Sequence, residues 1–128
     1  LAVADEWRFY DAYGQPFGDK VIAAVAPSVA HNIGQADIAG RHGGDEFVII
    51  LPSQSANEAL AVAERIRTSV EALEITAPDG AAVPITTSQG VAHYPTHARD
   101  TEGLREAADK ALYAAKEAGR NRAVIYTP

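Results

Sequence analysis

The sequence contains no cysteine, and cations are the minority among its charged residues, with 11 lysines and arginines against 17 aspartates and glutamates. The absence of cysteine excludes disulfide bonds and thiolate metal sites and is typical of proteins in a reducing cytosol. With a formal net charge of -6, the chain lacks the dominant basic surface of a general nucleic-acid binder, so we expect no nucleic-acid partner. An anionic ligand would need a local cluster of cations.

Long hydrophobic runs are also missing. No run approaches the roughly 20 apolar residues that cross a membrane, and the first residues, LAVADEW, lack the basic segment that opens a signal peptide. We therefore expect a soluble domain without membrane contact of its own, anchored, if at all, by a segment outside this chain. The 128 residues are 47% hydrophobic, which predicts one domain, residues 1–128, with a sizeable core.

Strand and helix patterns alternate along the chain. Apolar or β-branched runs predict strands within residues 1–4, 36–51, 83–95 and 122–127, the second segment being two strands joined by a glycine turn. Helical spacing of apolar residues predicts helices at residues 19–31, 55–73 and 101–118. The order β-α-β-β-α-β-α-β favours an α/β (α+β) fold, with a mixed sheet and helices packed against it.

Particular residues mark where these helices begin and end. Asp19 lies where the N-cap of the first helix is expected. Ser55 and Glu58 have the spacing of a capping box at the start of the second helix. Gly119 predicts the end of the third helix. Tyr113, on the side of that helix that we expect to face inward, is interpreted as a core residue.

The stretch RHGGDEFVIILP, residues 41–52, places two glycines and two carboxylates before a run of strand-forming residues. A tight turn that presents Asp45 and Glu46 could hold Mg²⁺ through hard oxygen ligands. Gly43 and Gly44 leave room for a ligand near the backbone. A plain acidic hairpin turn explains the same residues, because Gly-Asp turns are common.

The stretch KEAGR, residues 116–120, supplies cations near the end of the last predicted helix. Lys116 and Arg120 are four residues apart, which predicts that both lie on one helical face and can reach one phosphate group. Cations that complement the helix dipole are an equally ordinary explanation. Carboxylates for a metal and cations for phosphate are together the two halves of a nucleoside triphosphate site.

The chain resembles the GGDEF domain, the family of diguanylate cyclases, over nearly its whole length. Five stretches carry this resemblance: RHGGDEFVIILP, TTSQGVAHYP, ADKALYAAKEAGRNRAVIY, NEALAVAERIRTSVEAL and YGQPFGD. The resemblance implies a palm-like nucleotidyl cyclase fold with a mixed, mainly antiparallel sheet flanked by helices. The helix that usually precedes the first core strand in the family is not part of this sequence.

The reaction implied by the resemblance condenses two GTP molecules into cyclic di-GMP and releases pyrophosphate, with Mg²⁺ or Mn²⁺ as cofactor. Each of two domains holds one GTP, so catalysis needs a homodimer of half-sites. The resemblance also implies bacterial second-messenger signalling in the cytoplasm, by this domain alone or by the cytoplasmic part of a larger, membrane-anchored protein. The alternative is a weakly active or inactive module that binds GTP or cyclic di-GMP and signals through a partner.

The resemblance assigns roles to the residues that match the family motifs. Gly43 and Gly44 would line the nucleotide pocket. Asp45 would ligate the metal and help activate the attacking hydroxyl, and Glu46 would complete the acidic edge. Asp19 matches the carboxylate that reads the N1 and N2 edge of guanine.

The remaining matched residues concern the phosphates and the first loop. Lys116 and Arg120 match phosphate contacts. Arg8 stands in for the lysine of the family's first loop, and Tyr10 or Asp11 lies near the position of its guanine-binding asparagine. We therefore include Arg8 and Asp11 among the predicted substrate-binding residues.

The third metal ligand depends on how the first strand is aligned. Counting back from Gly14 without a gap places Ala2 or Val3 near the family's metal-binding aspartate, and neither can bind a metal. A loop about three residues shorter places Asp5 there. We prefer the second alignment, because it keeps a carboxylate at the end of an apolar strand.

The product-inhibition motif of the family, Arg-x-x-Asp, corresponds here to GQAD, residues 34–37. Asp37 is kept, but Gly34 replaces the arginine that would grip the cyclic dinucleotide. We predict that this inhibitory site is absent and that the product, if it binds, binds at the active half-site.

Overall fold

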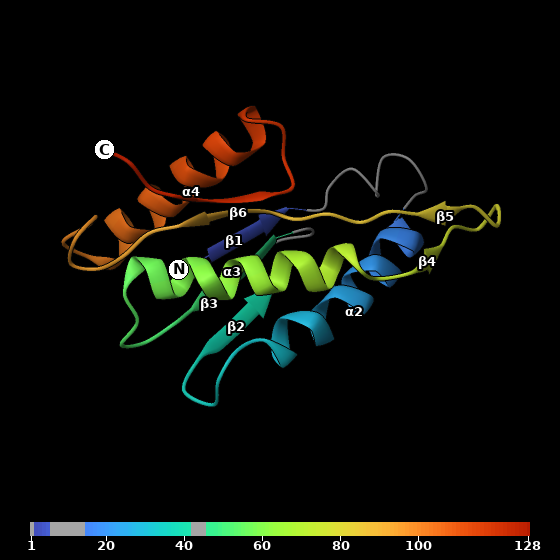
Figure 1. The fold of residues 1–128 in the computed structure, drawn as a ribbon, viewed down its shortest axis with the longest axis horizontal. Coiled ribbons are helices and arrows are strands. Elements are labelled where there is room, and N and C mark those ends of the chain that lie inside the picture. Colours follow the sequence, from blue (N-terminus) through green and yellow to red (C-terminus); the bar gives the residue numbers. More distant parts are fainter. Residues whose placement is uncertain (1, 6–14, 42–45) are drawn as a thin grey trace.

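Five strands form one mixed sheet in the computed structural model, which describes residues 2–5, 15–41 and 46–128 (Figure 1). The strand order is β2-β3-β1-β6-β7. Neighbouring strands are antiparallel except for β6 and β7, which are parallel. The bounds are β1 Ala2–Asp5, β2 Ile38–Arg41, β3 Glu46–Ile50, β6 Ser88–Val91 and β7 Arg122–Ile125. The predicted mixed, mainly antiparallel sheet is confirmed.

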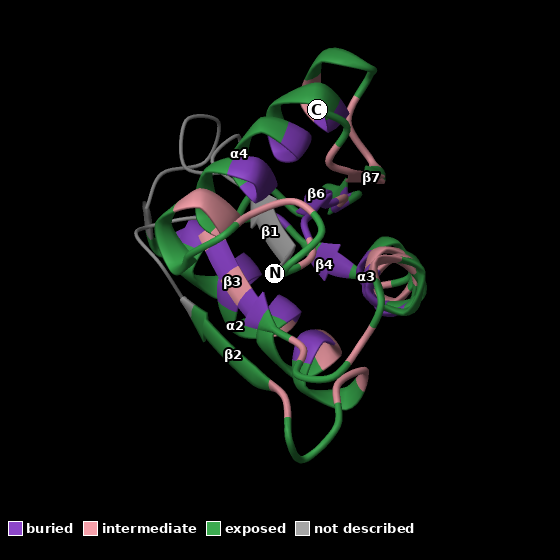
Figure 2. Cartoon of the chain, turned by 90° about the vertical axis from the view of Figure 1, so that its left-hand side faces the viewer, coloured by how far each residue is buried: buried purple, intermediate pink, exposed green. Residues whose placement is uncertain are grey.

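Helices cover both faces of this sheet. Figure 2 shows α4 on one side, and α2 and α3 together on the other. Their bounds are α2 Gln15–His31, α3 Ala56–Glu71 and α4 Thr101–Glu117. In the described part of the chain, no helix is both long enough and apolar enough to cross a membrane.

A small two-stranded hairpin, which the sequence did not predict, projects from one end of the molecule (Figure 1). It consists of β4 Ile75–Thr76 and β5 Ala82–Val83, paired antiparallel. Its turn contains Gly80 with φ +86°, a left-handed conformation that glycine adopts without steric cost.

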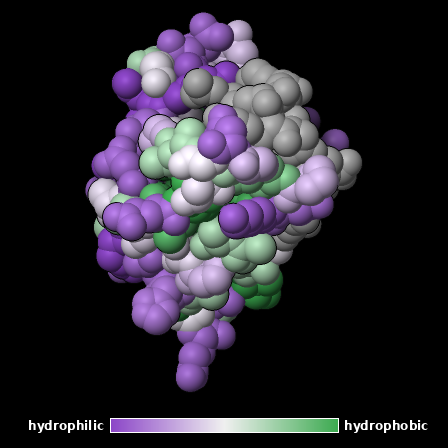
Figure 3. Space-filling view, turned by 90° about the vertical axis from the view of Figure 1, so that its right-hand side faces the viewer, coloured by the Kyte–Doolittle hydropathy of each residue, from purple (hydrophilic) through white to green (hydrophobic). Residues whose placement is uncertain are grey.

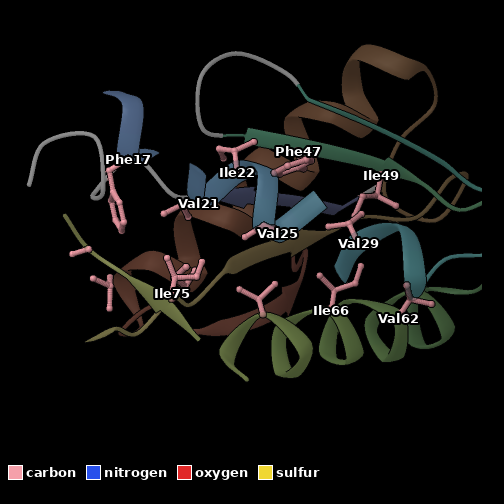
Figure 4. Close-up of a cluster of buried hydrophobic side chains, with 14 residues drawn as sticks. Phe17, Val21, Ile22, Val25, Val29, Phe47, Ile49, Val62, Ile66 and Ile75 are labelled. Atoms are coloured by element: carbon pink, nitrogen blue, oxygen red, sulfur yellow. The ribbon is translucent and has the colours of Figure 1, made fainter. Parts of the chain in front are cut away.

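The main core fills the space between the sheet and the pair α2 and α3. Val21 and Val25 of α2 and Val70 of α3 are completely buried. They belong to one cluster with Phe47 and Ile49, which alternate along β3 (Figure 4). The apolar side chains that alternate along β3 and those at helical spacing in α2 and α3 therefore pack into one core, as the sequence patterns predict.

On the other face, α4 lies unusually close to β6, because β6 has a glycine at the contact. A Cβ atom added to Gly90 would lie less than 3.0 Å from the backbone of both Ala108 and Leu112. The residues of α4 that face the sheet are correspondingly small, and apart from Leu112 the buried ones are Ala107, Ala108, Ala111 and Ala115. The prediction that Tyr113 is a core residue is wrong, since Tyr113 is 65% exposed. Tyr113 follows Leu104 by nine residues, which at about 100° per residue places it on the face of α4 turned away from the sheet.

The start of α2 also differs from the prediction. The helix begins at Gln15, so Asp19 is an exposed residue in the second turn and not the N-cap. Pro16 explains the difference, because proline is tolerated in the first turn of a helix, where its missing N–H has no helical acceptor in any case. Residues 15–18, which the prediction left outside the helix, are therefore already helical.

The predicted capping box of α3 is confirmed. The amide of Glu58 donates to Ser55 Oγ at 3.1 Å, and the amide of Ser55 donates to Glu58 Oε1 at 3.0 Å. The two bonds satisfy backbone donors that the first helical turn leaves without partners. The Ser55 amide, and after it the Ser55 side chain, hold the pKa of the Glu58 carboxyl below its ordinary value.

We expect Ser55→Ala to lower the free energy of unfolding by about 1 kcal/mol, measured by urea denaturation at neutral pH. Because the folded pKa of Glu58 is lowered, its share of the capping energy is present above its ordinary pKa and is lost as the pH falls through the lowered value. Glu58→Gln is the matched control, since it keeps an acceptor and removes this pH dependence. An unchanged denaturation midpoint in Ser55→Ala would contradict the expectation.

Candidate active site

The predicted catalytic elements meet at one end of the sheet. Strand β1 ends at Asp5, and Asp5 pairs with Glu46, the first residue of β3. One residue before Asp5, Ala4 pairs with Gln89 of β6, and Gln89 pairs with Ala123 of β7. The C-terminal end of β1 therefore lies level with the N-terminal ends of β3, β6 and β7, at the right-hand end of the five-stranded sheet in Figure 1.

This register supports the alignment that assigns the third carboxylate to Asp5. In the ungapped alternative, the metal position would fall on Ala2 or Val3, which pair with Ile49 and Val48. Those positions lie two to three residues from the end of the strand, or about 7–10 Å at the rise of a β-strand. Asp5, by contrast, is the last residue of β1 and pairs in the backbone register with Glu46, the first residue of β3.

Several predicted site residues lie outside the part of the chain that the structure describes. They are Arg8, Asp11, Gly43, Gly44 and Asp45, together with Tyr10 as the alternative to Asp11. Within the described residues, no group of three or more histidines, aspartates and glutamates is arranged to hold a metal ion. The predicted metal set includes Asp45, so its geometry stays a prediction.

The prediction that Lys116 and Arg120 share one helical face is wrong. Helix α4 ends at Glu117, and Arg120 follows Gly119 with a left-handed φ of +63°. The amide of Gly119 donates to the Lys116 carbonyl at 3.2 Å, and the amide of Arg120 donates to the Ala115 carbonyl at 3.0 Å. These are the two bonds of a Schellman motif. The helical period thus stops at the glycine, and one C-terminal motif contains both cations.

Asp19 lies on α2 near the projecting hairpin β4–β5. The neighbouring Lys20 donates through Nζ to the Thr76 carbonyl at 3.5 Å. A hollow of about 330 Å³ beside them is lined by Pro16, Phe17, Lys20, Thr76, Ala77 and Pro78. Figure 3 views the molecule from the side on which β4–β5 project, with apolar surface in the middle of that face among hydrophilic side chains. Asp19 itself is exposed.

A larger cavity, of about 720 Å³, lies at the opposite end of the sheet. It is lined by residues 50–55, by Tyr94 and by Thr101 and Leu104 at the start of α4. The cations lie at the other end of this helix of 17 residues, so about 20 Å separate Lys116 from Thr101 at 1.5 Å per residue. This cavity is therefore distinct from the predicted nucleotide site.

The segment that matches the product-inhibition motif forms a closed turn. The Asp37 carboxylate accepts from the Gly34 amide at 2.7 Å, and the Asp37 amide donates to the Gly34 carbonyl at 3.2 Å. Gly34 carries no side chain, so this turn contains no guanidinium at the position where the family motif has one.

Sequence reasoning missed one residue near the cations. Asn121 follows Arg120 with φ +48°, and its side chain contacts Arg67 and Glu71 of α3. The sequence could have indicated a left-handed turn at this position, because asparagine tolerates that conformation better than most residues.

The chain matches the family model described as "Diguanylate cyclase, GGDEF domain" over residues 5–122. It is 44% identical over 115 residues to Diguanylate cyclase A of Treponema denticola, covering 90% of this chain and 31% of that protein. It is 40% identical over 116 residues to the diguanylate cyclase DosC of Escherichia coli, covering 91% of this chain and 25% of that protein. The chain thus spans between a quarter and a third of the length of these two relatives.

The fold is also that of solved domains. The GGDEF domain of DgcB from Caulobacter crescentus, crystallised in complex with c-di-GMP, superposes with a TM-score of 0.87 at 33% sequence identity. The similarity covers 98% of this chain and 75% of that one.

Proposed function

The chain belongs to the GGDEF family of diguanylate cyclase domains, and from this premise we propose that it condenses two GTP molecules into cyclic di-GMP. The observation that carries the proposal is the pairing of Asp5 with Glu46 at the end of β1. It supports a complete set of metal-binding carboxylates in a chain whose first loop is irregular. We further propose that residues 1–128 act as one domain in the bacterial cytoplasm.

Two copies of the domain each hold one GTP, and the two bound nucleotides face each other. The 3′-hydroxyl oxygen of one GTP attacks the α-phosphorus of the other, and the bond to pyrophosphate breaks. The hydroxyl proton leaves toward Asp45. The 3′-hydroxyl of the second nucleotide attacks the α-phosphorus of the first in the same way, which closes the ring. Two GTP therefore give one cyclic di-GMP and two pyrophosphates. Positioning and charge neutralisation carry such a reaction more than covalent chemistry does.

The residues of one half-site divide the work. Asp5, Asp45 and Glu46 would hold Mg²⁺ or Mn²⁺, and the bound ion would neutralise charge on the phosphates. Lys116 and Arg120 contact the phosphate oxygens.

Base recognition and the first loop involve three further residues. Asp19 accepts hydrogen bonds from N1–H and N2–H of guanine, whereas adenine has an acceptor at N1 and no amino group at C2. This difference selects GTP over ATP. Arg8 and Asp11 complete the substrate contacts from the first loop.

Product is proposed to bind at the active half-site and not at the turn 34–37. The DgcB domain was crystallised with c-di-GMP, which supports the cyclic dinucleotide as a ligand of this fold. The turn here has Gly34 in place of an arginine, and its Asp37 carboxylate accepts from the Gly34 amide. A co-crystal with the product bound at Asp37 and absent from the hairpin of Asp45 would overturn this assignment.

The test is a product assay on the chain fused to a dimerising coiled coil, since an isolated domain offers only half a site. With GTP and Mg²⁺, we expect cyclic di-GMP and two equivalents of pyrophosphate, resolved by chromatography. Asp45→Ala should abolish product formation, and ATP should give none. Glu74→Gln, at an exposed carboxylate between α3 and β4, serves as the control and should keep full activity.

The second candidate function is a non-catalytic module that binds GTP or cyclic di-GMP and signals through a partner. The irregular first loop, LAVADEWRFYD, is the feature that favours it. In the same assay, GTP bound by the fused dimer without cyclic di-GMP formation at high protein concentration would reject the enzyme and support this alternative.

A further inference from the structure

The turn between α4 and β7 contains three successive residues with positive φ. The values are 120° for Gly119, 63° for Arg120 and 48° for Asn121. Glycine and asparagine enter this left-handed region readily, whereas arginine is disfavoured there. The backbone of Arg120 therefore needs neighbouring groups to hold its conformation.

Both backbone polar groups of Arg120 are hydrogen-bonded. Its amide donates to the Ala115 carbonyl at 3.0 Å, and its carbonyl accepts from Arg122 Nε at 3.0 Å. The first bond ties Arg120 to the last turn of α4, and the second ties it to the first residue of β7. The direction in which the Arg120 side chain leaves the turn is thereby restricted.

Asn121 ties the same turn to a third element, α3. Its Oδ1 accepts from Arg67 Nη1 at 3.2 Å, and its Nδ2 donates to Glu71 Oε2 at 2.6 Å. Arg67 has only 20% of its side chain exposed and donates through Nε to Glu64 Oε2 at 2.8 Å. Glu64 Oε1 in turn accepts from the Ala123 amide at 3.4 Å. Helix α3 packs on β7, so Asn121 is held by a firmly placed helix.

We propose that Asn121 is a positioning residue for Arg120, and that Arg67 and Glu71 act through it to set the phosphate-binding geometry of the half-site. The inference rests on the proposed phosphate contact of Arg120. Asn121 supplies two things at once, a residue type that accepts a left-handed backbone and a side chain that anchors the turn to α3. Loss of the anchor leaves the disfavoured conformation of Arg120 without its support from α3.

Three variants separate these contributions. Asn121→Gly keeps the left-handed backbone accessible and removes the anchor, whereas Asn121→Ala removes both. Arg67→Ala removes one partner of Asn121 on α3. Arg65→Ala is the matched control, because Arg65 lies on the same helix and donates instead to the Asn32 carbonyl at 3.1 Å.

We would measure the dissociation constant of 3′-deoxy-GTP from the protein by isothermal titration calorimetry in the presence of Mg²⁺. The protein is the full chain fused to the dimerising coiled coil. This nucleotide has no 3′-hydroxyl and cannot react, so the result does not depend on turnover. We expect about tenfold weaker binding in Asn121→Gly and in Arg67→Ala, and a still larger loss in Asn121→Ala. Arg65→Ala should stay within twofold of the unmodified chain.

If Asn121 positions Arg120, the loss of nucleotide affinity in Asn121→Gly depends on the Arg120 side chain. In an Arg120→Ala background, Asn121→Gly should therefore cause no further loss of affinity. An equal loss in both backgrounds, or unchanged affinity in Asn121→Gly alone, would overturn the inference. A chain that binds 3′-deoxy-GTP in this pattern but forms no cyclic di-GMP would reject the proposed activity and leave the positioning role intact.

Discussion

Replacement of Gly90 by alanine is expected to lower the free energy of unfolding by about 3 kcal/mol. The added Cβ would lie less than 3.0 Å from backbone atoms of α4, near Ala108 and Leu112. A flexible side chain could move away, but a helix backbone can only shift as a unit, and α4 packs on β6, β7 and β1. Because α4 also bears Lys116, such a shift should weaken GTP binding as well.

Gly40 is the matched control for this substitution. It lies in the edge strand β2, and a Cβ built there meets nothing within 4 Å. Gly40→Ala should therefore change the stability by less than about 0.5 kcal/mol. Urea denaturation of both variants measures the difference, and equal midpoints for Gly90→Ala and the unmodified chain would show that α4 is not in close contact with β6.

Asp5→Asn is expected to reduce cyclic di-GMP formation at least about 100-fold, while the domain stays folded. Asparagine keeps the size of the side chain and removes the charge that a divalent cation needs. Asp5 pairs with Glu46 in the sheet, a second proposed metal ligand, so the Mg²⁺ concentration for half-maximal activity should rise too. Initial rates across a Mg²⁺ titration measure both effects.

The outcome also decides between the two alignments of the first strand. If Asp5→Asn turns over GTP at the rate of the unmodified chain, Asp5 is not the third carboxylate. The ungapped alignment, with Ala2 or Val3 at that position, would then hold. A circular dichroism melt of the variant distinguishes lost catalysis from lost folding.

Much of the fold follows from local patterns in the sequence. The period of two in β3 and the helical spacing in α2 predict which side chains are buried, because one apolar face of each element must find the core. The capping box of Ser55 and Glu58 predicts the start of α3 because it depends only on residues three apart. The antiparallel pairing of β2 with β3 is also predictable, because the two strands are close in the sequence.

The errors have local causes in α4 and a distant cause at Asn121. Tyr113 is exposed because it follows Leu104 by nine residues, which at about 100° per residue places it on the opposite face of α4. Arg120 leaves the helical face because a Schellman motif ends the helix. The contacts of Asn121 cannot be predicted from its sequence neighbours, because its partners Arg67 and Glu71 are distant in the sequence and approach it only when α3 packs beside the turn.

The most direct test of the proposed reaction is a mixed dimer with one unmodified domain and one Asp45→Ala domain, joined by a heterodimeric coiled coil. If each domain activates one hydroxyl, the mixed dimer forms one phosphodiester bond and stops. We therefore expect the linear dinucleotide pppGpG to accumulate with little cyclic di-GMP, both identified by mass spectrometry. Cyclic di-GMP at about half the rate of the unmodified dimer would contradict it, because that result requires a complete site within one chain.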